Sequence, residues 1–331
     1  MEKPMTAPLC LERQDEGGIA LDVNRTHGIH LDGNRQAHGI ILTDNGFPFA
    51  ATVLSPLVEL AKRLAAAPGS SQYEPMCELL GMNCNVPTDI RFSFSGLVER
   101  GGRTGEHKDG WGIAFYADRG CRAFHDASPS CESPLAELVR RLSIKSLNVI
   151  CHIRKATNGR ICQENTHPFL RELWGRHWAF AHNGRLKGIK KKRLDYYRPI
   201  GTTDSEHAFC WMMDQIRQRY PEGPPAPKTL QALVTKLTDE IAEHGVFNML
   251  LCDSRHLYCH CATHLSWLTR CAPFGPASLI DRELTVDFAK ETTPKDIVTV
   301  IATRPLTEGE PWRIMAPGEM VVFHNGLPVS D

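Results

Sequence analysis

The sequence predicts an α+β fold, in which short strands and amphipathic helices share one core. Three observations support this: several segments have the two-residue period of strands, two have the 3.6-residue period of helices, and 42% of the 331 residues are apolar. That apolar content is sufficient for a hydrophobic core, which excludes a disordered chain or a disulfide-stapled mini-protein. No long internal repeat occurs, so solenoids and propellers are not expected.

The first 75 residues differ from the rest of the chain. They contain turn signals at Asp32 and Asp44, one candidate helix at residues 55–67, and a Pro-Gly-Ser-Ser break at residues 68–71. They lack the pattern of a complete core. We therefore expect residues 1–75 to be an extension, either mistranslated upstream sequence or a cleaved propeptide, and residues 76–331 to form the folded domain.

Predicted strands are spread along this domain. Residues 143–154 contain an alternating apolar set, and residues 178–181 continue the strand pattern up to the turn signal Asn183-Gly184. The alternating set is Leu147, Val149, Cys151 and Ile153, and further strands are predicted at residues 246–252, 257–261, 297–302 and 320–324.

Two amphipathic helices are predicted between these strands. The first begins at the capping-box sequence Thr-Asp-Ser-Glu at residues 203–206, and the second follows a proline-rich loop at residues 221–227 and closes at Gly245. Their apolar stripes are Phe209, Met212, Met213 and Ile216 in the first, and Leu230, Leu233, Val234, Leu237 and Ile241 in the second.

Composition and charge argue against several classes of function. The 38 basic residues balance 38 acidic ones, so no overall field attracts nucleic acid or an anionic membrane. The N-terminus has no apolar run of signal-peptide length, and no apolar stretch approaches the roughly 20 residues of a transmembrane helix. The 12 cysteines are scattered without a CxxC pair, which indicates reduced thiols and a cytoplasmic location.

Two local clusters suggest binding sites but have simpler explanations. Cys259, His260, Cys261 and His264 lie close enough in sequence to suggest a soft-metal site. On a strand, however, the two cysteines share one face while His260 points to the other, so we expect no metal. The basic run at residues 187–193 suits a phosphate or an acidic partner, but a solvated loop explains it more simply.

Four short segments contain the residue types that amide chemistry needs. They read Met-Cys-Glu-Leu-Leu-Gly at 76–81, His-Ile-Arg-Lys-Ala-Thr-Asn-Gly at 152–159, His-Asn-Gly at 182–184 and Thr-Asp-Ser-Glu at 203–206. Taken singly, each has a structural explanation. Cys77 suits a small buried residue, Arg154 a surface charge, Asn183-Gly184 a hairpin turn and Asp204 a helix cap.

In this order and spacing, the four segments resemble the class II glutamine amidotransferases, which are N-terminal-nucleophile hydrolases. The sequences Asp-Gly-Trp-Gly at residues 109–112 and Glu-Asn-Thr-His-Pro-Phe at residues 164–169 extend the resemblance, which covers residues 76–331. It implies a four-layer αββα sandwich, with two antiparallel sheets between helices. It also implies Cys77 as nucleophile, Asn183 and Gly184 as oxyanion hole, and Arg154, Asp204, Thr157 and His167 as residues of the substrate pocket. No cofactor is implied.

The residue chemistry agrees with these roles. A primary amide is a poor electrophile, so its cleavage needs a strong nucleophile, a base, stabilisation of the carbonyl oxygen, and an acid for the leaving ammonia. If Cys77 is the first residue, its free α-amine serves as both base and acid. Asn183 and Gly184 offer N–H donors, Arg154 a bidentate partner for a carboxylate, and Asp204 an acceptor for an ammonium group.

Three functional hypotheses follow. The protein either takes glutamine and passes ammonia to a separate synthase, or hydrolyses another γ-glutamyl metabolite on its own. It is instead a catalytically silent binding module if the extension is retained, because the Cys77 amine is then part of a peptide bond. Met76 precedes a small residue, the context in which an initiator Met is removed, so we expect the active chain to begin at Cys77.

Overall fold

The computed structural model describes residues 10–13, 19–22, 77–156 and 159–329. The chain divides into two compact units, Met1–Tyr73 and Glu74–Asp331. In the first unit, β1 (Cys10–Arg13) and β2 (Ile19–Asp22) form an antiparallel pair. The helix predicted at residues 55–67 lies outside the described residues.

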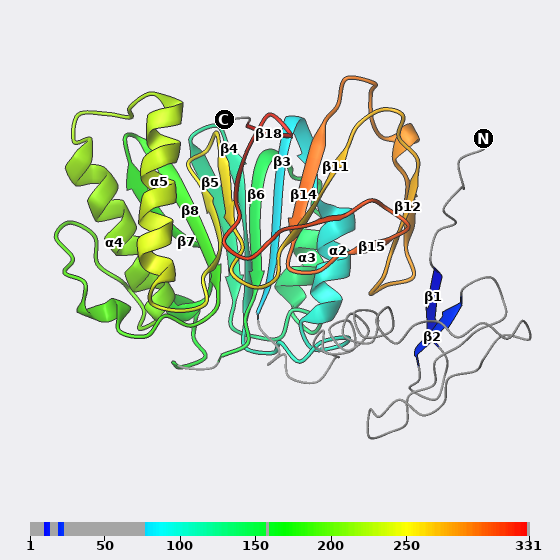
Figure 1. The fold of residues 1–331 in the computed structure, drawn as a ribbon, viewed down its shortest axis with the longest axis horizontal. Coiled ribbons are helices and arrows are strands. Elements are labelled where there is room, and N and C mark those ends of the chain that lie inside the picture. The colour runs from blue at the N-terminus through cyan, green and yellow to red at the C-terminus, as the bar shows by residue number, and fades with distance from the viewer. Residues whose placement is uncertain (1–9, 14–18, 23–76, 157–158, 330–331) are drawn as a thin grey trace, which may run out of the picture. The chain divides into compact units, whose positions relative to one another are not determined.

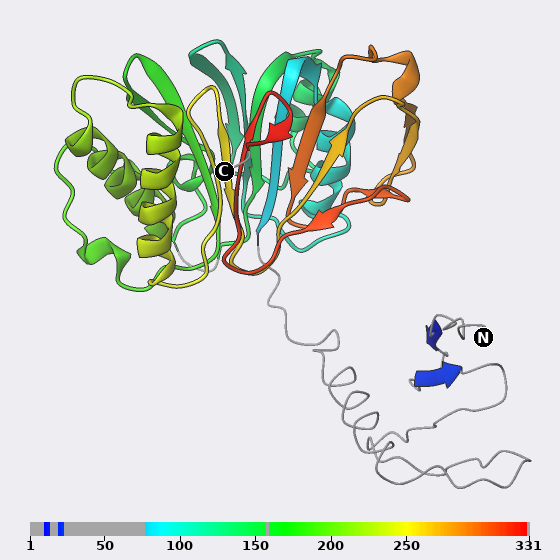
Figure 2. The ribbon, with the colours of Figure 1, turned by 45° about the horizontal axis from the view of Figure 1, so that its top comes forward.

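The second unit is a four-layer sandwich of helices around two antiparallel sheets. Figures 1 and 2 show α4 (Asp204–Arg219) and α5 (Pro227–Ala242) outside one sheet, and α2 (Arg91–Arg100) and α3 (Pro134–Arg141) outside the other. This is the αββα arrangement that the resemblance implies, and it confirms the α+β prediction. Among the described residues, no helix is long and apolar enough to cross a membrane.

The strands of this unit assemble into three sheets. In chain order they are β3 (Glu78–Asp89), β4 (Trp111–Ala117), β5 (Gly120–Asp126), β6 (Lys145–Ile153), β7 (Phe169–Leu173), β8 (Arg176–Asn183), β9 (Asn248–Cys252), β10 (Leu257–His260), β11 (Ser266–Arg270), β12 (Pro276–Leu279), β13 (Thr285–Asp287), β14 (Val298–Ala302), β15 (Thr307–Glu308), β16 (Arg313–Ile314), β17 (Met320–His324) and β18 (Leu327–Pro328). The larger sheets have the orders β16-β11-β14-β3-β6-β4-β5 and β18-β17-β10-β9-β8-β7, and the third has the order β13-β12-β15.

Three layers of apolar side chains hold the sandwich together. Because alternate residues of a strand point to opposite faces, Leu79 packs between the two sheets while Leu80 packs toward α2 and α3. In the same way, Ala181 of β8 lies between the sheets and Phe180 packs against α4, where its ring stacks on Phe209 at 4.9 Å. Both sheets are therefore buried on both faces.

Most of the predicted elements occur. The helices predicted from apolar stripes are α4 and α5, and the predicted strands correspond to β6, β8, β9, β10, β14 and β17. Thr203 caps α4 by accepting a hydrogen bond from the N–H of Glu206 at 3.1 Å. The carboxylate of Glu206 binds elsewhere, accepting the N–H groups of Ile200 and Gly201, so the reciprocal half of the predicted capping box is absent from this helix start.

The cysteine and histidine run has the alternating geometry expected of a strand. Cys259 and Cys261 lie between the two sheets, whereas the Nδ1 of His260 lies 2.6 Å from the carbonyl oxygen of Phe247 on the opposite side. Across the described residues, no group of three or more His, Cys, Asp or Glu side chains is placed to hold a metal ion.

The basic run at residues 187–193 contains a short 3-10 turn, Ile189–Lys191, whose lysines are exposed. Lys192 lies against the ring of Trp211, 4.0 Å from its centroid, and pairs with Glu240. Lys192 therefore packs along α4 and α5, whereas the exposed lysines agree with a solvated loop.

Candidate active site

The candidate residues lie at one end of the two sheets, on the faces that meet. Cys77 directly precedes β3 and lies two residues before Leu79, whereas Arg154 directly follows β6. Glu78 pairs with Ile153 in the sheet register, which brings the chain at Cys77 beside the chain at residues 154–155. Asn183, two residues beyond Ala181, is the last residue of β8 in the facing sheet. The period of two thus directs these side chains toward the space between the sheets.

The sulfur of Cys77 lies against the backbone of Lys155. The N–H of Lys155 donates to Sγ at 3.1 Å, and Sγ is 3.4 Å from the carbonyl oxygen of the same residue. Desolvation raises the pKa of the Cys77 thiol to about 11, while the Lys155 backbone and the charge of Arg154 act in the opposite direction. Formation of the thiolate therefore needs a base close to the sulfur.

Asn183 reaches Cys77 across 106 positions of sequence. Its Nδ2 donates a hydrogen bond to the carbonyl oxygen of Cys77. Asn248 holds the backbone here, because its Nδ2 donates to the carbonyl of Asn183 at 3.1 Å while its Oδ1 accepts the N–H groups of Ala262 and Thr263. The hairpin-turn interpretation of Asn183-Gly184 is wrong, since β8 pairs with β7 and β9 and neither pair is joined at this point.

Gly184 occupies a position that admits no side chain. Its φ is +149°, and a Cβ atom would lie 1.9 Å from the carbonyl oxygen of Val246. An alanine would therefore push the two backbone segments apart. The close approach keeps the peptide after Asn183 fixed relative to β9.

Arg154 is buried although its guanidinium is charged. Only 4% of the residue is exposed, and Nη1 donates to the carbonyl of Arg160 at 3.0 Å. A Cβ atom built on Gly159 would lie 3.6 Å from Nη2 of Arg154 and from Nδ2 of Asn165, so Gly159 lies close to both side chains. The surface-charge interpretation of Arg154 is therefore wrong.

Asp204 lies in the first turn of α4 and binds two backbone N–H groups. Oδ2 accepts the N–H of Leu186 at 2.8 Å, and Oδ1 accepts the N–H of Ser205 at 2.9 Å. The first bond ties the segment that follows Gly184 to the start of the helix. The N-cap of α4 is Thr203, so Asp204 is not the capping residue but lies one position later, in the first turn, and anchors the loop beyond Asn183.

Of the two other residues expected in the pocket, Thr157 and His167, the structure describes only His167. Thr157 lies outside the described residues. His167 is buried, with its ring 4.3 Å from those of His152 and Phe169, and neither ring nitrogen of His167 or His152 has a hydrogen-bond partner within the described residues. Burial lowers the pKa of both imidazoles, that of His152 to about 3, and the charges of His182 and Arg154 act in the same direction. His167 therefore lies behind the site among aromatic rings.

The structure adds an ionic cluster behind Cys77 to the residues found by sequence reasoning. The carboxylate of Glu78 is buried and binds Arg100 at 3.1 Å and Arg304 at 2.5 Å. Arg100 also donates to Asp281 at 2.7 Å. A carboxylate directly after Cys77 was visible in the sequence, but its partners lie far away along the chain.

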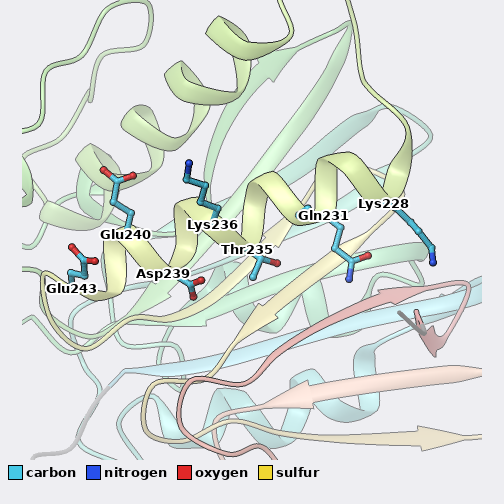
Figure 3. Close-up of a pocket in the computed structure, with 8 residues that line it drawn as sticks. Lys228, Gln231, Thr235, Lys236, Asp239, Glu240 and Glu243 are labelled. Atoms are coloured by element: carbon cyan, nitrogen blue, oxygen red, sulfur yellow. The ribbon is translucent and has the colours of Figure 1, made fainter.

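A surface hollow of about 760 Å³ lies along α5 (Figure 3). Its lining comes from this one helix and the residue after it, and the figure shows Lys228, Lys236 and Glu240 among the labelled side chains. None of the site residues predicted from sequence lines this hollow.

Comparison with known proteins gives consistent matches. A family model described as glutamine amidotransferases class-II matches residues 76–330. YafJ of Escherichia coli K12, provisionally named a glutamine amidotransferase, is 55% identical over 248 residues, 75% of this chain and 97% of that protein. A Haemophilus influenzae protein with the same provisional name is 46% identical over 256 residues, 77% of this chain and 87% of that protein.

Solved structures give the same picture. The crystal structure of a predicted glutamine amidotransferase from Pseudomonas aeruginosa PA01 is 46% identical, covers 77% of this chain and 100% of its own, and has a TM-score of 0.61. The glutamine phosphoribosylpyrophosphate amidotransferase of Bacillus subtilis is 15% identical, covers 77% of this chain and 49% of its own, and has a TM-score of 0.51. The second match is a likeness of fold alone.

Proposed function

The chain belongs to the class II glutamine amidotransferases, and from this premise we propose that it cleaves the γ-amide of glutamine through a thioester on Cys77. The observation that supports this most directly is the contact between Asn183 and Cys77, which brings an N–H donor to the nucleophile. An N–H donor beside the nucleophile suits an oxyanion that forms when sulfur attacks a carbonyl carbon.

The proposed reaction has two steps. The α-amine of Cys77 takes the proton from Sγ, and the sulfur attacks the γ-carbonyl carbon of glutamine. Asn183 Nδ2 and the N–H of Gly184 hold the oxyanion, the C–N bond breaks, and ammonia leaves with the proton that the amine returns. Water then attacks the thioester, releasing glutamate and restoring the thiol.

The α-amine is free to act only when no residue precedes Cys77. We therefore propose that the active chain runs from Cys77 to Asp331, 255 residues, and that residues 1–75 are not part of it. The free cysteines among the described residues are consistent with the reducing cytoplasm that we propose as its location.

Substrate recognition is proposed for two charged side chains. Arg154 offers its guanidinium to the α-carboxylate of glutamine, because a planar fork matches a carboxylate bidentately. Asp204 accepts the α-ammonium group, since a carboxylate that already binds two N–H groups retains further acceptor positions. Thr157 and His167 are proposed as further residues of the pocket, His167 acting from behind it.

The proposal has two forms, which differ in the substrate and in what becomes of the released ammonia or amine. As an amidotransferase subunit, the protein delivers ammonia to a separate synthase. As a stand-alone hydrolase, it acts on a different γ-glutamyl compound and releases an amine. The substrate is in both cases a γ-glutamyl amide, with no nucleic acid or membrane involved.

Two measurements test the proposal. Intact-mass and N-terminal mapping of the native protein should locate its first residue at Cys77. Glutamate release should then be measured with glutamine and a panel of γ-glutamyl amides, for the full chain and for a chain that begins at Cys77. We expect turnover from the shorter chain only. An active protein that retains residues 1–75 would disprove the N-terminal-amine mechanism, and a correctly processed protein that hydrolyses no member of the panel would favour the silent binding module.

A further inference from the structure

The N–H of Lys155 is aimed at the sulfur that the proposed reaction uses. It lies 3.1 Å from Sγ of Cys77. A thiolate accepts a hydrogen bond more strongly than a neutral thiol does, so this donor favours the charged form of the sulfur. It is a backbone group, and its direction depends on whatever holds the peptide between Arg154 and Lys155.

Asp109 binds that peptide and the peptide after it. The N–H of Asp109 donates to the carbonyl oxygen of Arg154 at 3.1 Å, and this carbonyl belongs to the same planar peptide as the N–H of Lys155. Fixing one end of the plane orients the other. The carboxylate Oδ2 of Asp109 accepts the N–H of Ala156 at 2.6 Å, which fixes the next peptide along the chain.

The residue after Asp109 completes the attachment. The carbonyl oxygen of Gly110 accepts the N–H of Arg154 at 2.8 Å. Gly110 has a φ of +113°, and a Cβ atom would lie 3.0 Å from the carbonyl oxygen of Asp126. Asp109 therefore sits on a turn that is packed tightly against the neighbouring strand end.

We propose that Asp109 is a positioning residue that aims the Lys155 N–H at Cys77 and thereby stabilises the attacking thiolate. Its importance for turnover rests on the proposed function, but its effect on the reactivity of the thiol does not. The side-chain bond to Ala156 is the part of this arrangement that substitution can remove.

Two substitutions of Asp109 change the thiol in different ways. Asp109→Ala keeps the backbone bond to Arg154 but removes the acceptor for Ala156, so the Lys155 N–H is held less firmly and the pKa of Cys77 rises. Asp109→Asn keeps an acceptor oxygen but loses the negative charge, which alone leaves the pKa unchanged or lowers it. The direction of the change thus distinguishes alignment from charge.

The experiment measures alkylation of Cys77 by iodoacetamide against pH in the full chain, with the labelled peptide quantified by mass spectrometry. Losing one aligned donor should slow labelling of Asp109→Ala about three- to tenfold at pH 8, as expected for a pKa increase of about half to one unit. Asp109→Asn should label within about twofold of the native protein or faster.

Asp253→Ala is the matched control. Asp253 is a buried carboxylate that accepts the N–H groups of Arg255 and His256 and contacts none of the site residues. It should leave the labelling of Cys77 unchanged. Equal labelling of Asp109→Ala and the native protein would overturn the proposal, as would equal slowing in both alanine variants or equal slowing in Asp109→Asn.

Glutamate release from the same variants, measured in a chain that begins at Cys77, separates this inference from the proposed function. A lower kcat in Asp109→Ala with KM little changed supports the positioning role in turnover. If labelling changes as expected but no protein releases glutamate from any γ-glutamyl amide, the proposed function fails and the role of Asp109 in the reactivity of Cys77 stands.

Discussion

The side-chain amide of Asn183 donates to the backbone carbonyl of Cys77, so one residue of the second sheet contacts the proposed nucleophile of the first. An amide nitrogen carries two N–H groups, and the second one suits the proposed oxyanion. Asn183→Ala removes both. Because this donor acts on charge that develops in the transition state, kcat for glutamate release should fall roughly a hundred- to a thousandfold with KM little changed.

Asn148→Ala is a suitable control for this prediction, because Asn148 is another buried asparagine. Its side chain accepts a hydrogen bond from Nδ2 of Asn83 at 2.7 Å and does not contact Cys77. Steady-state kinetics on a chain beginning at Cys77 should show little change in kcat for it. If Asn183→Ala raises KM and spares kcat, the oxyanion hole lies elsewhere.

Cys77→Ala should abolish glutamate release and leave the fold intact, since it removes the proposed nucleophile and little buried volume. Cys77→Ser should keep slight activity at most. Cys84→Ala, which changes another cysteine of the same β3 region, should remain active. Circular dichroism and glutamate release measured together check this, and wild-type turnover by Cys77→Ala would refute the N-terminal-nucleophile assignment.

Arg154→Lys should weaken substrate binding and act mainly on KM. Lysine keeps the charge but loses the bidentate fork, and a lost charge-assisted hydrogen bond is worth about 1.5–3 kcal/mol, or roughly ten- to a hundredfold in KM. Arg176→Lys, at the opposite end of β8 from Asn183, is the control and should leave KM unchanged. An unchanged KM in Arg154→Lys would remove Arg154 from substrate binding.

Gly184→Ala should destabilise the fold more than Gly175→Ala does. Both glycines have positive φ, which costs a non-glycine residue about 1–2 kcal/mol, but a Cβ on Gly175 meets no atom within 4 Å whereas one on Gly184 meets Val246. The clash adds about 1–3 kcal/mol to the loss in the free energy of unfolding. Urea titration of both variants measures the difference, and equal losses would show that the backbone relaxes freely at Gly184.

Stability should fall as the solution becomes acidic, in the window set by the buried histidines. The pKa of His152 is about 3 in the folded protein and about 6.5 when unfolded, and that of His167 is also lowered. Below pH 6.5 the unfolded chain takes up protons that the folded chain does not. Each such histidine therefore lowers the free energy of unfolding by about 1.4 kcal/mol for every pH unit of acidification, until the pH reaches its folded pKa.

His152→Gln should reduce the dependence of the free energy of unfolding on pH between 6.5 and 4, because glutamine does not titrate. Chemical denaturation at several pH values measures this slope. An unchanged slope in the variant would mean that His152 takes up its proton equally in both states.

Clear periodicity in the sequence explains why some helices were predicted and others were not. The helices α4 and α5 each bury one face, so their apolar positions repeat at the helical spacing. In α2, nine of ten residues are buried, so its sequence has no apolar stripe. Its N-cap residue, Ile90, makes no side-chain capping bond, and Asp89 instead accepts the N–H of Arg91 at 2.9 Å. By contrast, α3 does carry a start signal, Ser133 followed by Pro134, which sequence reasoning missed.

The candidate site divides in the same way. Cys77, Arg154 and Asn183 could be proposed from the sequence because their side chains offer a thiol, a guanidinium and an amide, and because the spacing of their segments is distinctive. The contribution of Lys155 is a backbone N–H, which any residue other than proline provides, so no side-chain pattern indicates it. The importance of Asp109 follows from its contact with that segment, which appears only once β4 lies beside β6.

The strand that follows Cys77 has a consequence for the timing of biosynthesis. β3 is an inner strand, with β6 on one side and β14 on the other, and the N–H of Leu79 donates to Thr303 over 224 positions of sequence. A ribosome adding about 5–20 residues per second needs roughly 10–45 s to travel that distance. Throughout this interval β3 lacks one of its two neighbours, so the chain at Cys77 is not yet enclosed by the finished sheet.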